Sequence, residues 1–280
     1  MEIFKEIEPL KAFLRQQKIA TRSLGFVPTM GALHQGHLSL IKASKVENAL
    51  TICSIYVNPA QFNNLTDLAK YPRALDQDIE LLRKTDCDVL FCPDNSTMYS
   101  SESLIRFDFG MLDKVMEGRY RPGHFSGVAL VVSKLFHIVS PDKAYFGQKD
   151  FQQFKVIEKL VQELKFDITL RCMPIERESD GLAMSSRNVR LLAEQRKKAI
   201  IFYDSLKETR ELLEKGNSMQ NVLKVIINKF ENSNEVRLEY LELADVSNLS
   251  PQENVSDKIN AILLIAGYVG EVRLIDNLLL

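Results

Sequence analysis

The chain has 280 residues, of which 45% are hydrophobic and 26% charged, a composition that suits a globular protein of one large domain or two unequal ones. Its 36 lysine and arginine residues nearly balance 37 acidic residues, and the net charge of −1 argues against a broad nucleic-acid-binding face. The longest apolar run, at 261–269, is too short to cross a bilayer, and the N-terminal segment has no apolar core resembling a signal peptide. We therefore expect a cytoplasmic protein with no membrane or nucleic-acid partner.

Residues 1–175 alternate short apolar runs with segments of helical periodicity. This alternation predicts an α/β fold with a Rossmann-like parallel sheet covered by helices on both faces. Ligands of such sheets bind at the carboxyl ends of the strands, near a topological switch point. We expect strands at 24–27, 50–57, 88–91, 144–146 and 168–173, and helices at 38–46, 76–84, 128–139 and 151–165.

The rhythm changes after residue 176. A loop leads into two long helical stretches, at 192–214 and 219–232, and three strand-like runs follow, at 236–243, 261–268 and 271–275. This order predicts that residues 176–280 form a smaller C-terminal α+β domain with an antiparallel sheet.

The loop after the first of these strands is the most informative stretch of the chain. The strand at 24–27 breaks at Pro28, and a glycine-containing turn leads to His34 and His37, which open a helix. A spacing of three puts both imidazoles on one face of the first helical turn, where free backbone N–H groups and the helix dipole attract anions. The motif resembles the His-x-Gly-His signature of nucleotidyl-transferring Rossmann-like enzymes. The alternative is a plain tight turn with two incidental histidines.

Two later strand ends carry further candidates. Gln61 follows the strand at 50–57 and offers both an amide donor and a carbonyl acceptor, which suits a hydroxy acid; alternatively it is a turn residue that faces solvent. Lys149 follows the strand at 144–146 and has the compact charge of a phosphate ligand, or is a solvated lysine in a turn. Gln153 lies one helical turn later and faces the same side.

Two more segments could supply cations. Arg121 and His124 precede the apolar helix at 128–139 and could lie next to an anionic ligand, or form a surface loop with a capping histidine. The run 185–187, Ser-Ser-Arg, offers two hydroxyls and a bidentate cation for phosphate oxygens, or is common linker composition. The four cysteines show no Cys-x-x-Cys spacing, which predicts buried, reduced thiols.

Taken in order, these motifs resemble the pantoate–β-alanine ligase family, part of the superfamily that includes class I aminoacyl-tRNA synthetases. The resemblance covers nearly the full chain. Its motifs are Pro28-Thr29-Met30-Gly31, His34-x-Gly36-His37, Val57-Asn58-Pro59-x-Gln61-Phe62, Tyr71-Pro72-Arg73, Arg121-Pro122-Gly123-His124-Phe125, Lys134-Leu135-Phe136, Phe146-Gly147-x-Lys149-Asp150, Gln152-Gln153, Asp180-Gly181-Leu182-Ala183, Ser185-Ser186-Arg187-Asn188 and Val272-Arg273-Leu274-Ile275-Asp276-Asn277.

The resemblance implies a two-step reaction. The carboxylate of D-pantoate attacks the α-phosphorus of MgATP to give pantoyl adenylate and pyrophosphate, and the amine of β-alanine then attacks the acyl carbon to release AMP and pantothenate. It further implies a homodimer whose C-terminal domain acts as a lid, with ATP as a substrate accompanied by Mg²⁺ and no tightly bound organic cofactor.

The resemblance also implies roles for individual residues. The catalytic residues would be His37, often the proton donor in this family, with His34, Lys149 and Arg187. Pantoate would bind Gln61 and Gln153, β-alanine would bind Gln61, and Arg121 and His124 would lie near the phosphates. The ATP-binding residues would be Met30, Gly31, Ala32, Leu33, His34, Gln35, Gly36, His37, Gly147, Gln148, Lys149, Asp150, Glu176, Met184, Ser185, Ser186 and Arg187.

Four positions depart from the family pattern. Gln148 stands where many relatives have glutamate, Glu176 where an apolar residue usually meets the adenine, and Met184 where a lysine can occur. Gln77 stands where some relatives have an aspartate close to the magnesium, and because Asp78 is adjacent the metal ligands stay unassigned. The rival interpretations are another small-molecule nucleotidyltransferase on the same fold and a non-catalytic ATP-binding module.

Overall fold

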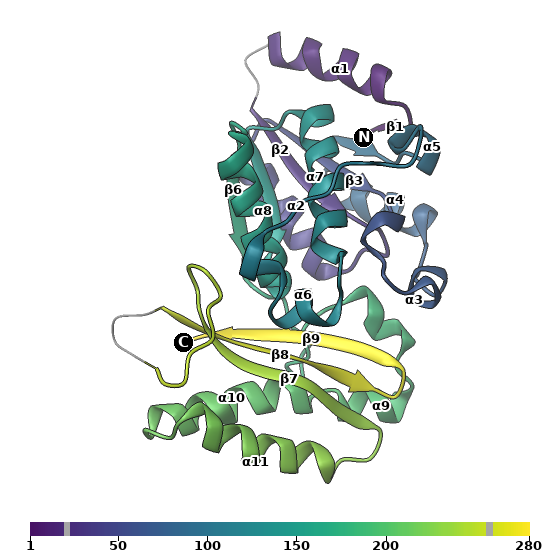
Figure 1. The fold of residues 1–280 in the computed structure, drawn as a ribbon. Coiled ribbons are helices and arrows are strands. Elements are labelled where there is room, and N and C mark those ends of the chain that lie inside the picture. The colour runs from purple at the N-terminus through teal and green to yellow at the C-terminus, as the bar shows by residue number, and fades with distance from the viewer. Residues whose placement is uncertain (20–22, 256–259) are drawn as a thin grey trace.

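The computed structural model describes residues 1–19, 23–255 and 260–280. It has a larger part built on a six-stranded sheet and, below it in Figure 1, a smaller part built on a three-stranded sheet. Elements up to residue 175 are β1 (Glu2–Phe4), α1 (Ile7–Ile19), β2 (Leu24–Thr29), α2 (Gln35–Glu47), β3 (Leu50–Ile55), η1 (Pro59–Gln61), α3 (Leu65–Ala69), α4 (Leu75–Lys84), β4 (Val89–Phe91), α5 (Asn95–Met98), η2 (Gly110–Asp113), α6 (Met116–Tyr120), α7 (His124–Val139), β5 (Lys143–Gly147), η3 (Gln148–Asp150), α8 (Phe151–Leu164) and β6 (Thr169–Met173). After them come η4 (Ser186–Arg190), α9 (Ala193–Lys198), α10 (Ile201–Glu214), α11 (Met219–Glu231), β7 (Val236–Asp245), β8 (Ala261–Val269) and β9 (Val272–Leu279).

The larger sheet is parallel throughout and has the order β1-β4-β3-β2-β5-β6. The chain moves outward from β2 through β3 to β4 and then returns to the other side of β2 to form β5. The switch point therefore lies between β2 and β5, where loops diverge to opposite faces and leave a crevice at the carboxyl ends of the strands. The predicted fold class is confirmed.

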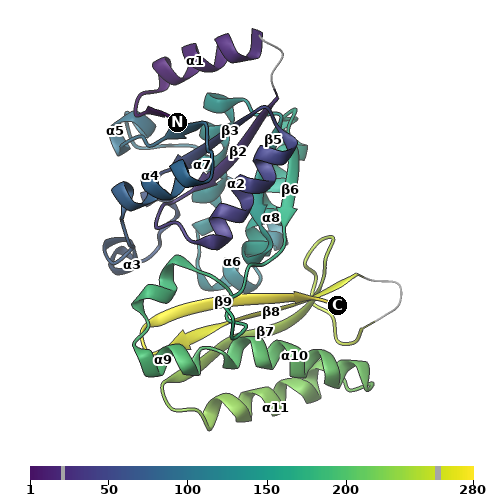
Figure 2. The ribbon, with the colours of Figure 1, turned by 180° about the vertical axis from the view of Figure 1, so that it is seen from behind.

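Residues alternate between the two faces of this sheet because successive side chains of a strand point to opposite sides. Phe26 and Ile52 pack with α1, α7 and α8 in one apolar core, whereas Val27 and Cys53 pack with α2 and α4 in another. Figure 1 shows α7 and α8 in front of the sheet, and Figure 2 shows α2 and α4 in front of the opposite face. This double burial explains why the strands are apolar runs without polar alternation.

Strand β2 does not end before Pro28, as the sequence had suggested, but continues to Thr29. Pro28 pairs in register with Ser54 of β3, and the pairing of β2 with β5 covers only Gly25 and Phe26. Pro28 therefore lies beyond the last residue of β2 that pairs with β5. A missing N–H at that position removes no ladder hydrogen bond, so the proline is tolerated.

The smaller sheet is antiparallel, in the order β7-β8-β9, and α10 and α11 cover its outer face (Figure 1). Its inner face packs against the larger part of the molecule, where Met116 of α6 and Phe151 of α8 share an apolar cluster with Tyr240, Ile262 and Leu264. The two parts thus share buried apolar surface as well as a cleft.

Several local expectations were wrong or incomplete. The helical stretch at 192–214 is two helices, α9 and α10, that meet at Ala199 and Ile200. Strand β1, helix α1 and the short helices between β3 and α7 were not predicted. Of the four cysteines, Cys53 and Cys87 are buried, but Cys172 is exposed at the edge strand β6. Among the described residues, no helix combines the length and apolar character needed to span a membrane.

Candidate active site

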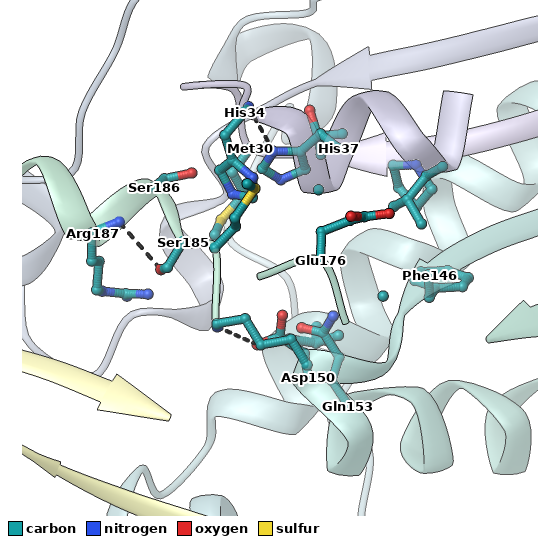
Figure 3. Close-up of a pocket in the computed structure, with 18 of the residues that line it drawn as sticks. Met30, His34, His37, Phe146, Asp150, Gln153, Glu176, Ser185, Ser186 and Arg187 are labelled. Carbon is teal, nitrogen blue, oxygen red and sulfur yellow. Dashed lines mark hydrogen bonds and ion pairs between the residues drawn. The ribbon is translucent and has the colours of Figure 1, made fainter. Parts of the chain in front are cut away.

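A cleft at the carboxyl edge of the parallel sheet collects loops from four strands (Figure 3). It includes about 1210 Å³ of empty space, part of which is open to solvent. The loops after β2, β3 and β5 form one side, and the segment after β6 forms the other. Its lining residues are Pro28, Thr29, Met30, His34, Gly36, His37, Leu40, Tyr56, Gln61, Tyr71, Val128, Val131, Val132, Leu135, Phe146, Gly147, Lys149, Asp150, Gln153, Pro174, Ile175, Glu176, Met184, Ser185, Ser186 and Arg187.

The turn after β2 has a backbone conformation that only its glycine permits. A buried carboxylate holds the turn in that conformation. Gly31 has a φ of +77°, and a Cβ at this position would lie 2.9 Å from both Asp78 Oδ2 and a methyl of Ile55, so only glycine fits. The N–H groups of Ala32 and Leu33 donate to the two carboxylate oxygens of Asp78 at 2.9 and 2.7 Å. Both oxygens of this 2%-exposed side chain therefore have backbone partners.

His34 and His37 lie on one side of the cleft, at the N-terminus of α2. Their ring centroids are 4.1 Å apart, which confirms that the spacing of three brings the imidazoles together. The backbone N–H of His34 donates to Nδ1 of His37 at 3.3 Å. Neutral His37 then carries its proton on Nε2. Nδ1 of His34 is buried against the backbone of Gly36 and has no hydrogen-bond partner among the described residues.

Both histidines are neutral at physiological pH. Burial lowers the pKa of His37 to about 3, helped by the neighbouring His34 and Lys149. Burial also lowers the pKa of His34 to about 4, with a further contribution from Lys149. The charge at this side of the cleft therefore comes from Lys149 and not from imidazolium groups.

Lys149 lies in the short helix η3 that follows β5, and its Nζ is 3.7 Å from the carboxylate of Asp150. The turn that carries it is held by Asn277 of β9, whose amide donates to the carbonyl oxygens of Gln148 and Lys149 at 2.9 and 3.0 Å. The amide of Gln148 donates in return to Asn277 Oδ1 at 3.0 Å. Asn277 is 1% exposed, so a buried side chain from the C-terminal strand determines where Lys149 lies.

Gln61 reaches the cleft from η1, which packs unusually close to α7. A Cβ on Gly127 would lie 2.1 Å from the carbonyl oxygen of Ala60, so glycine is required for this approach. The amide of Asn58 donates to Gln61 Oε1 at 3.2 Å, and Tyr99 donates to Asn58 Oδ1 at 2.8 Å. This chain of bonds fixes which end of the Gln61 amide is the donor.

His124 is not the cation that the sequence suggested. Its Nδ1 lies 2.8 Å from the carbonyl oxygen of Gln61, so Nδ1 carries the proton and donates it to that bond. Burial lowers the pKa of His124 to about 3, with a further contribution from the nearby Arg121. The side chain is a neutral support for η1, behind the main cleft.

The opposite side of the cleft is the segment Met184–Arg190. The hydroxyl of Ser186 donates to the carbonyl oxygen of Ala32 at 3.0 Å and joins this segment to the glycine turn. Arg187 donates from Nη2 to Asp67 Oδ2 at 2.9 Å, and Arg190 donates from Nη1 to Asp67 Oδ1 at 3.1 Å. Burial acts to lower the pKa of Arg187, but the bonded carboxylate of Asp67 outweighs it and raises that pKa.

A second charged cluster lies behind this side and joins the two parts of the molecule. Glu117 is 6% exposed and accepts from both terminal nitrogens of Arg273, at 2.8 and 2.7 Å, and from the hydroxyl of Tyr240 at 2.9 Å. Arg121 is held more loosely, 3.5 Å from the same carboxylate. Arg121 and Arg273 both line a neighbouring cavity that also touches Lys149 and Arg187.

The structure thus brings most of the predicted site residues to one cleft. Gly31, Ala32 and Leu33 support it as the turn held by Asp78, whereas the side chain of Gln35 is exposed and outside the lining. The remaining predicted residues that do not line the main cleft are Gln148, Arg121 and His124, and their contacts are those given above.

Three residues near the cleft were missed as contributors. Asn58 and Asn277 stood within recognised motifs, and their asparagine side chains in otherwise apolar or structured runs were the available signal. Asp67 gave no signal, because nothing in its neighbouring residues distinguishes it from the other acidic residues of the chain. Gln77 is exposed, and Asp78 is occupied by backbone N–H groups, so neither has the surroundings of a metal ligand.

Comparisons with known proteins give a consistent result. A family model described as pantoate-beta-alanine ligase matches residues 2–279. A pantothenate synthetase from Cytophaga hutchinsonii is 46% identical over 278 residues, which cover 98% of this chain and 97% of that protein. One from Thermosipho africanus is 43% identical over 280 residues and covers 100% of both chains.

Solved structures agree with these sequence relatives. The crystal structure of pantothenate synthetase from Thermus thermophilus matches with a TM-score of 0.92 and 40% identity over 99% of each chain. The crystal structure of a pantoate-beta-alanine ligase from Francisella tularensis matches with a TM-score of 0.85 and 38% identity over 100% of this chain and 97% of that one. That protein is described as complexed with beta-gamma ATP and beta-alanine.

Proposed function

The chain belongs to the pantoate–β-alanine ligase family, and on this premise we propose how its residues carry out the reaction of that family. It is a ligase that uses ATP to join D-pantoate to β-alanine through an amide bond, with pantoyl adenylate as the intermediate and AMP and pyrophosphate as products. The observation that carries the residue assignments is the convergence of His34, His37, Gln61, Lys149 and Gln153 on one cleft.

His37 acts as a neutral hydrogen-bond donor to the reacting phosphate. Its pKa of about 3 keeps it uncharged, and the N–H of His34 occupies Nδ1, which leaves the Nε2 proton for a ligand. A donor fixed in place before the reaction stabilises charge as it develops, without the cost of reorganising. His34, which lines the same cleft, contacts the same phosphates.

Cations and hydroxyls stabilise the charge that builds up on the α-phosphate and the leaving pyrophosphate. Lys149 is close enough to lower the pKa of His34 and lies 3.7 Å from Asp150, and its compact charge can follow the moving phosphoryl group. Ser185, Ser186 and Arg187 approach from the other side of the cleft. Glu176 is exposed at the cleft beside Gly36 and lies at the nucleoside end.

Gln61 and Gln153 bind pantoate, and Gln61 also contacts β-alanine. Asn58 and Tyr99 hold the Gln61 amide in one orientation, so its carbonyl and amino groups present a fixed pattern to a hydroxy acid. Figure 3 shows Gln153 directed into the cleft from α8. Apolar residues of α7 line the same region, including Val128, Val131 and Leu135, and an apolar lining lowers the access of water to the reactive adenylate.

Magnesium enters as part of the MgATP substrate. The described residues contain no group of three His, Cys, Asp or Glu side chains placed to hold a metal ion. A magnesium ion held mainly by phosphates and water needs only one or two carboxylates, and the exposed carboxylate of Asp150 is at the cleft. We further propose a cytoplasmic homodimer in which residues 176–280 act as a lid.

The decisive experiment measures pyrophosphate release from MgATP with D-pantoate, with and without β-alanine, and identifies the products by mass spectrometry. We expect pantoate-dependent turnover to AMP and pantothenate. His37→Ala should lose this turnover by about 10²–10³-fold. His137→Ala is the matched control, because His137 is exposed on α7 and away from the cleft lining.

A folded protein that binds ATP but shows no pantoate-dependent turnover would refute the proposed substrate. A product in which AMP or CMP is attached to a phosphate acceptor would instead identify another nucleotidyltransferase on this fold. Equal activity of His37→Ala and His137→Ala would leave the ligase reaction standing and refute the assignment of His37.

A further inference from the structure

The motif Lys134-Leu135-Phe136 contains a lysine to which the proposed reaction assigns no role. Lys134 lies on α7 and does not line the cleft, and its Nζ donates to the carbonyl oxygen of Met98 at 2.6 Å. The same Nζ is 4.1 Å from the centroid of the Tyr99 ring, a distance at which the face of an aromatic ring attracts a cation. One ammonium group therefore holds both the end of α5 and the ring that follows it.

Tyr99 connects Lys134 to the side chain of Asn58. The Tyr99 hydroxyl donates to Asn58 Oδ1 at 2.8 Å. Burial raises the pKa of Tyr99 to about 12, so at physiological pH the hydroxyl keeps the proton that it donates. Among the described residues, the side chain of Asn58 makes four hydrogen bonds, and the one from Tyr99 is the shortest. Tyr99 therefore restrains the position of this buried amide.

Asn58 in turn determines which end of the Gln61 amide faces a ligand. The amide of Asn58 donates to Gln61 Oε1 at 3.2 Å, whereas Gln61 Nε2 lies 3.1 Å from Met30 Sδ, and both Gln61 and Met30 line the cleft. A thioether sulfur is only a weak acceptor, so a ligand oxygen can replace it. Gln61 thus offers N–H groups to the cleft, and an acceptor oxygen of a hydroxy acid fits them.

We propose that Lys134 and Tyr99 are positioning residues for pantoate, and that they act through Asn58 on Gln61. This inference rests on the proposed ligase function, which assigns Gln61 to pantoate. Tyr99 lines a separate cavity and not the cleft, so neither of the two positioning residues touches the substrate. A donor that is held in one orientation does not lose rotational freedom when pantoate binds, and this saving strengthens binding.

The test is steady-state kinetics of the full-length protein at saturating MgATP and β-alanine. Tyr99→Phe removes only the donor to Asn58, so KM for D-pantoate should rise about fivefold while KM for ATP stays within about twofold. Lys134→Met keeps the aliphatic stem without the ammonium group and should act in the same direction. Lys134→Arg should restore the KM for pantoate, because a guanidinium group also binds an aromatic face and donates hydrogen bonds. The double variant should exceed neither single variant, since both act through one bond.

Tyr145→Phe is the matched control. The Tyr145 hydroxyl accepts from the amide of Asn48 at 2.7 Å, away from the cleft lining, so this variant should lower stability and leave both KM values unchanged. If Tyr99→Phe behaves in the same way, or raises both KM values equally, the positioning role is overturned. If Lys134→Met does not fold, Tyr99→Phe decides. A wild-type protein without pantoate-dependent turnover would refute the proposed function itself, whereas normal turnover with an unchanged KM for pantoate in the variants would refute only the positioning role.

Discussion

We name the two sides of the cleft the histidine wall (Met30–His37) and the arginine wall (Met184–Arg190). In the histidine wall, hydrogen bonds between mostly uncharged groups fix the side chains. In the arginine wall, ion pairs fix them. Asp78 holds the backbone of the histidine wall through two N–H groups, whereas Asp67 holds the side chains of the arginine wall. Buried hydrogen bonds to a fixed backbone suit a group that must be in place before the reaction. Ion pairs can exchange one anion for another, which suits a part of the site that takes up and releases phosphates.

The largest expected effect is on the free energy of unfolding, and it comes from breaking a buried ion pair near the arginine wall. Arg177 makes two bonds to Asp276, at 2.7 and 3.0 Å, and one to the carbonyl oxygen of Gly181 at the start of the loop that leads to this wall. Burial raises the pKa of Asp276, and Arg177 opposes that rise. Arg177→Gln leaves the carboxylate buried without its cation and should lower the free energy of unfolding by about 3–5 kcal/mol.

The matched control for that variant is Arg171→Gln. Arg171 pairs with Glu47 at 3.1 Å on the surface, with 43% of its side chain exposed. A surface pair of this kind is screened by solvent and contributes little to the free energy of unfolding. Urea denaturation at pH 7 compares the two variants, and equal destabilisation would contradict the claim that burial makes the Arg177 contact important.

Lys149 follows β5 on the histidine side of the cleft, and its removal should affect both the reacting phosphates and the two histidines. Lys149→Ala removes the charge that stabilises the leaving pyrophosphate and should slow pantoate-dependent adenylation by about 10²–10³-fold. It should also raise the pKa of His34 and His37, because Lys149 contributes to lowering both. Adenylation is measured as pyrophosphate release, and the histidines are titrated by NMR. Lys159→Ala, which breaks an exposed pair with Glu163 on α8, should do neither; a normal adenylation rate in Lys149→Ala would contradict the role of Lys149.

The neutral state of the histidine wall predicts how stability depends on pH. The folded-state pKa values of His34 and His37 lie at about 4 and 3, below the ordinary histidine pKa of 6.5. The unfolded chain therefore binds protons first, so the stabilising contribution is complete above pH 6.5 and is lost as pH falls toward 4. Each such histidine adds a slope of about 1.4 kcal/mol per pH unit, or about 2 kcal/mol by pH 5.

Chemical denaturation between pH 8 and pH 4.5 measures this dependence. His37→Asn removes one titrating group, so the slope of stability against pH should fall by the contribution of one histidine. His137→Asn, on the exposed side of α7, should leave the slope unchanged. The pantoate-dependent release of pyrophosphate should show no histidine inflection near pH 6.5. An inflection there that disappears in His37→Asn would mean that the histidine titrates in the working enzyme and that the wall is not neutral.

The sequence predicted those features that depend on neighbouring residues. Strand, glycine turn and helix start lie within a dozen residues, so the location of His34 and His37 followed from local spacing alone. The same holds for Lys149 and Gln153, one helical turn apart. The alternation of apolar runs and helices predicted the parallel sheet, because a strand buried on both faces is apolar throughout.

What could not be predicted depends on contacts between distant residues. Asp67 and Arg187 are 120 residues apart, and Asn277 and Gln148 are 129 apart; no local pattern marks either pair. The sequence predicts that the strand ends at Pro28. The strand continues because β5 stops pairing with it before that position, and only the tertiary structure shows where that pairing stops. The prediction that His124 is a cation was wrong for the same reason, because burial against η1 keeps its imidazole neutral.

The smallest predicted effect tests whether Asn277 positions Lys149. Its amide bonds the carbonyl oxygens of Gln148 and Lys149, so Asn277→Ala should leave the charge of Lys149 in place but let its turn shift. A misplaced catalytic group loses rate even when it is present, and we expect kcat to fall about tenfold with KM for ATP changed less than threefold. Asn277→Asp should be worse than the alanine variant, because a buried carboxylate would face two carbonyl oxygens that need donors. If both variants lowered stability while kcat stayed normal, Asn277 would support only the fold, and the position of Lys149 would have to be explained by η3 alone.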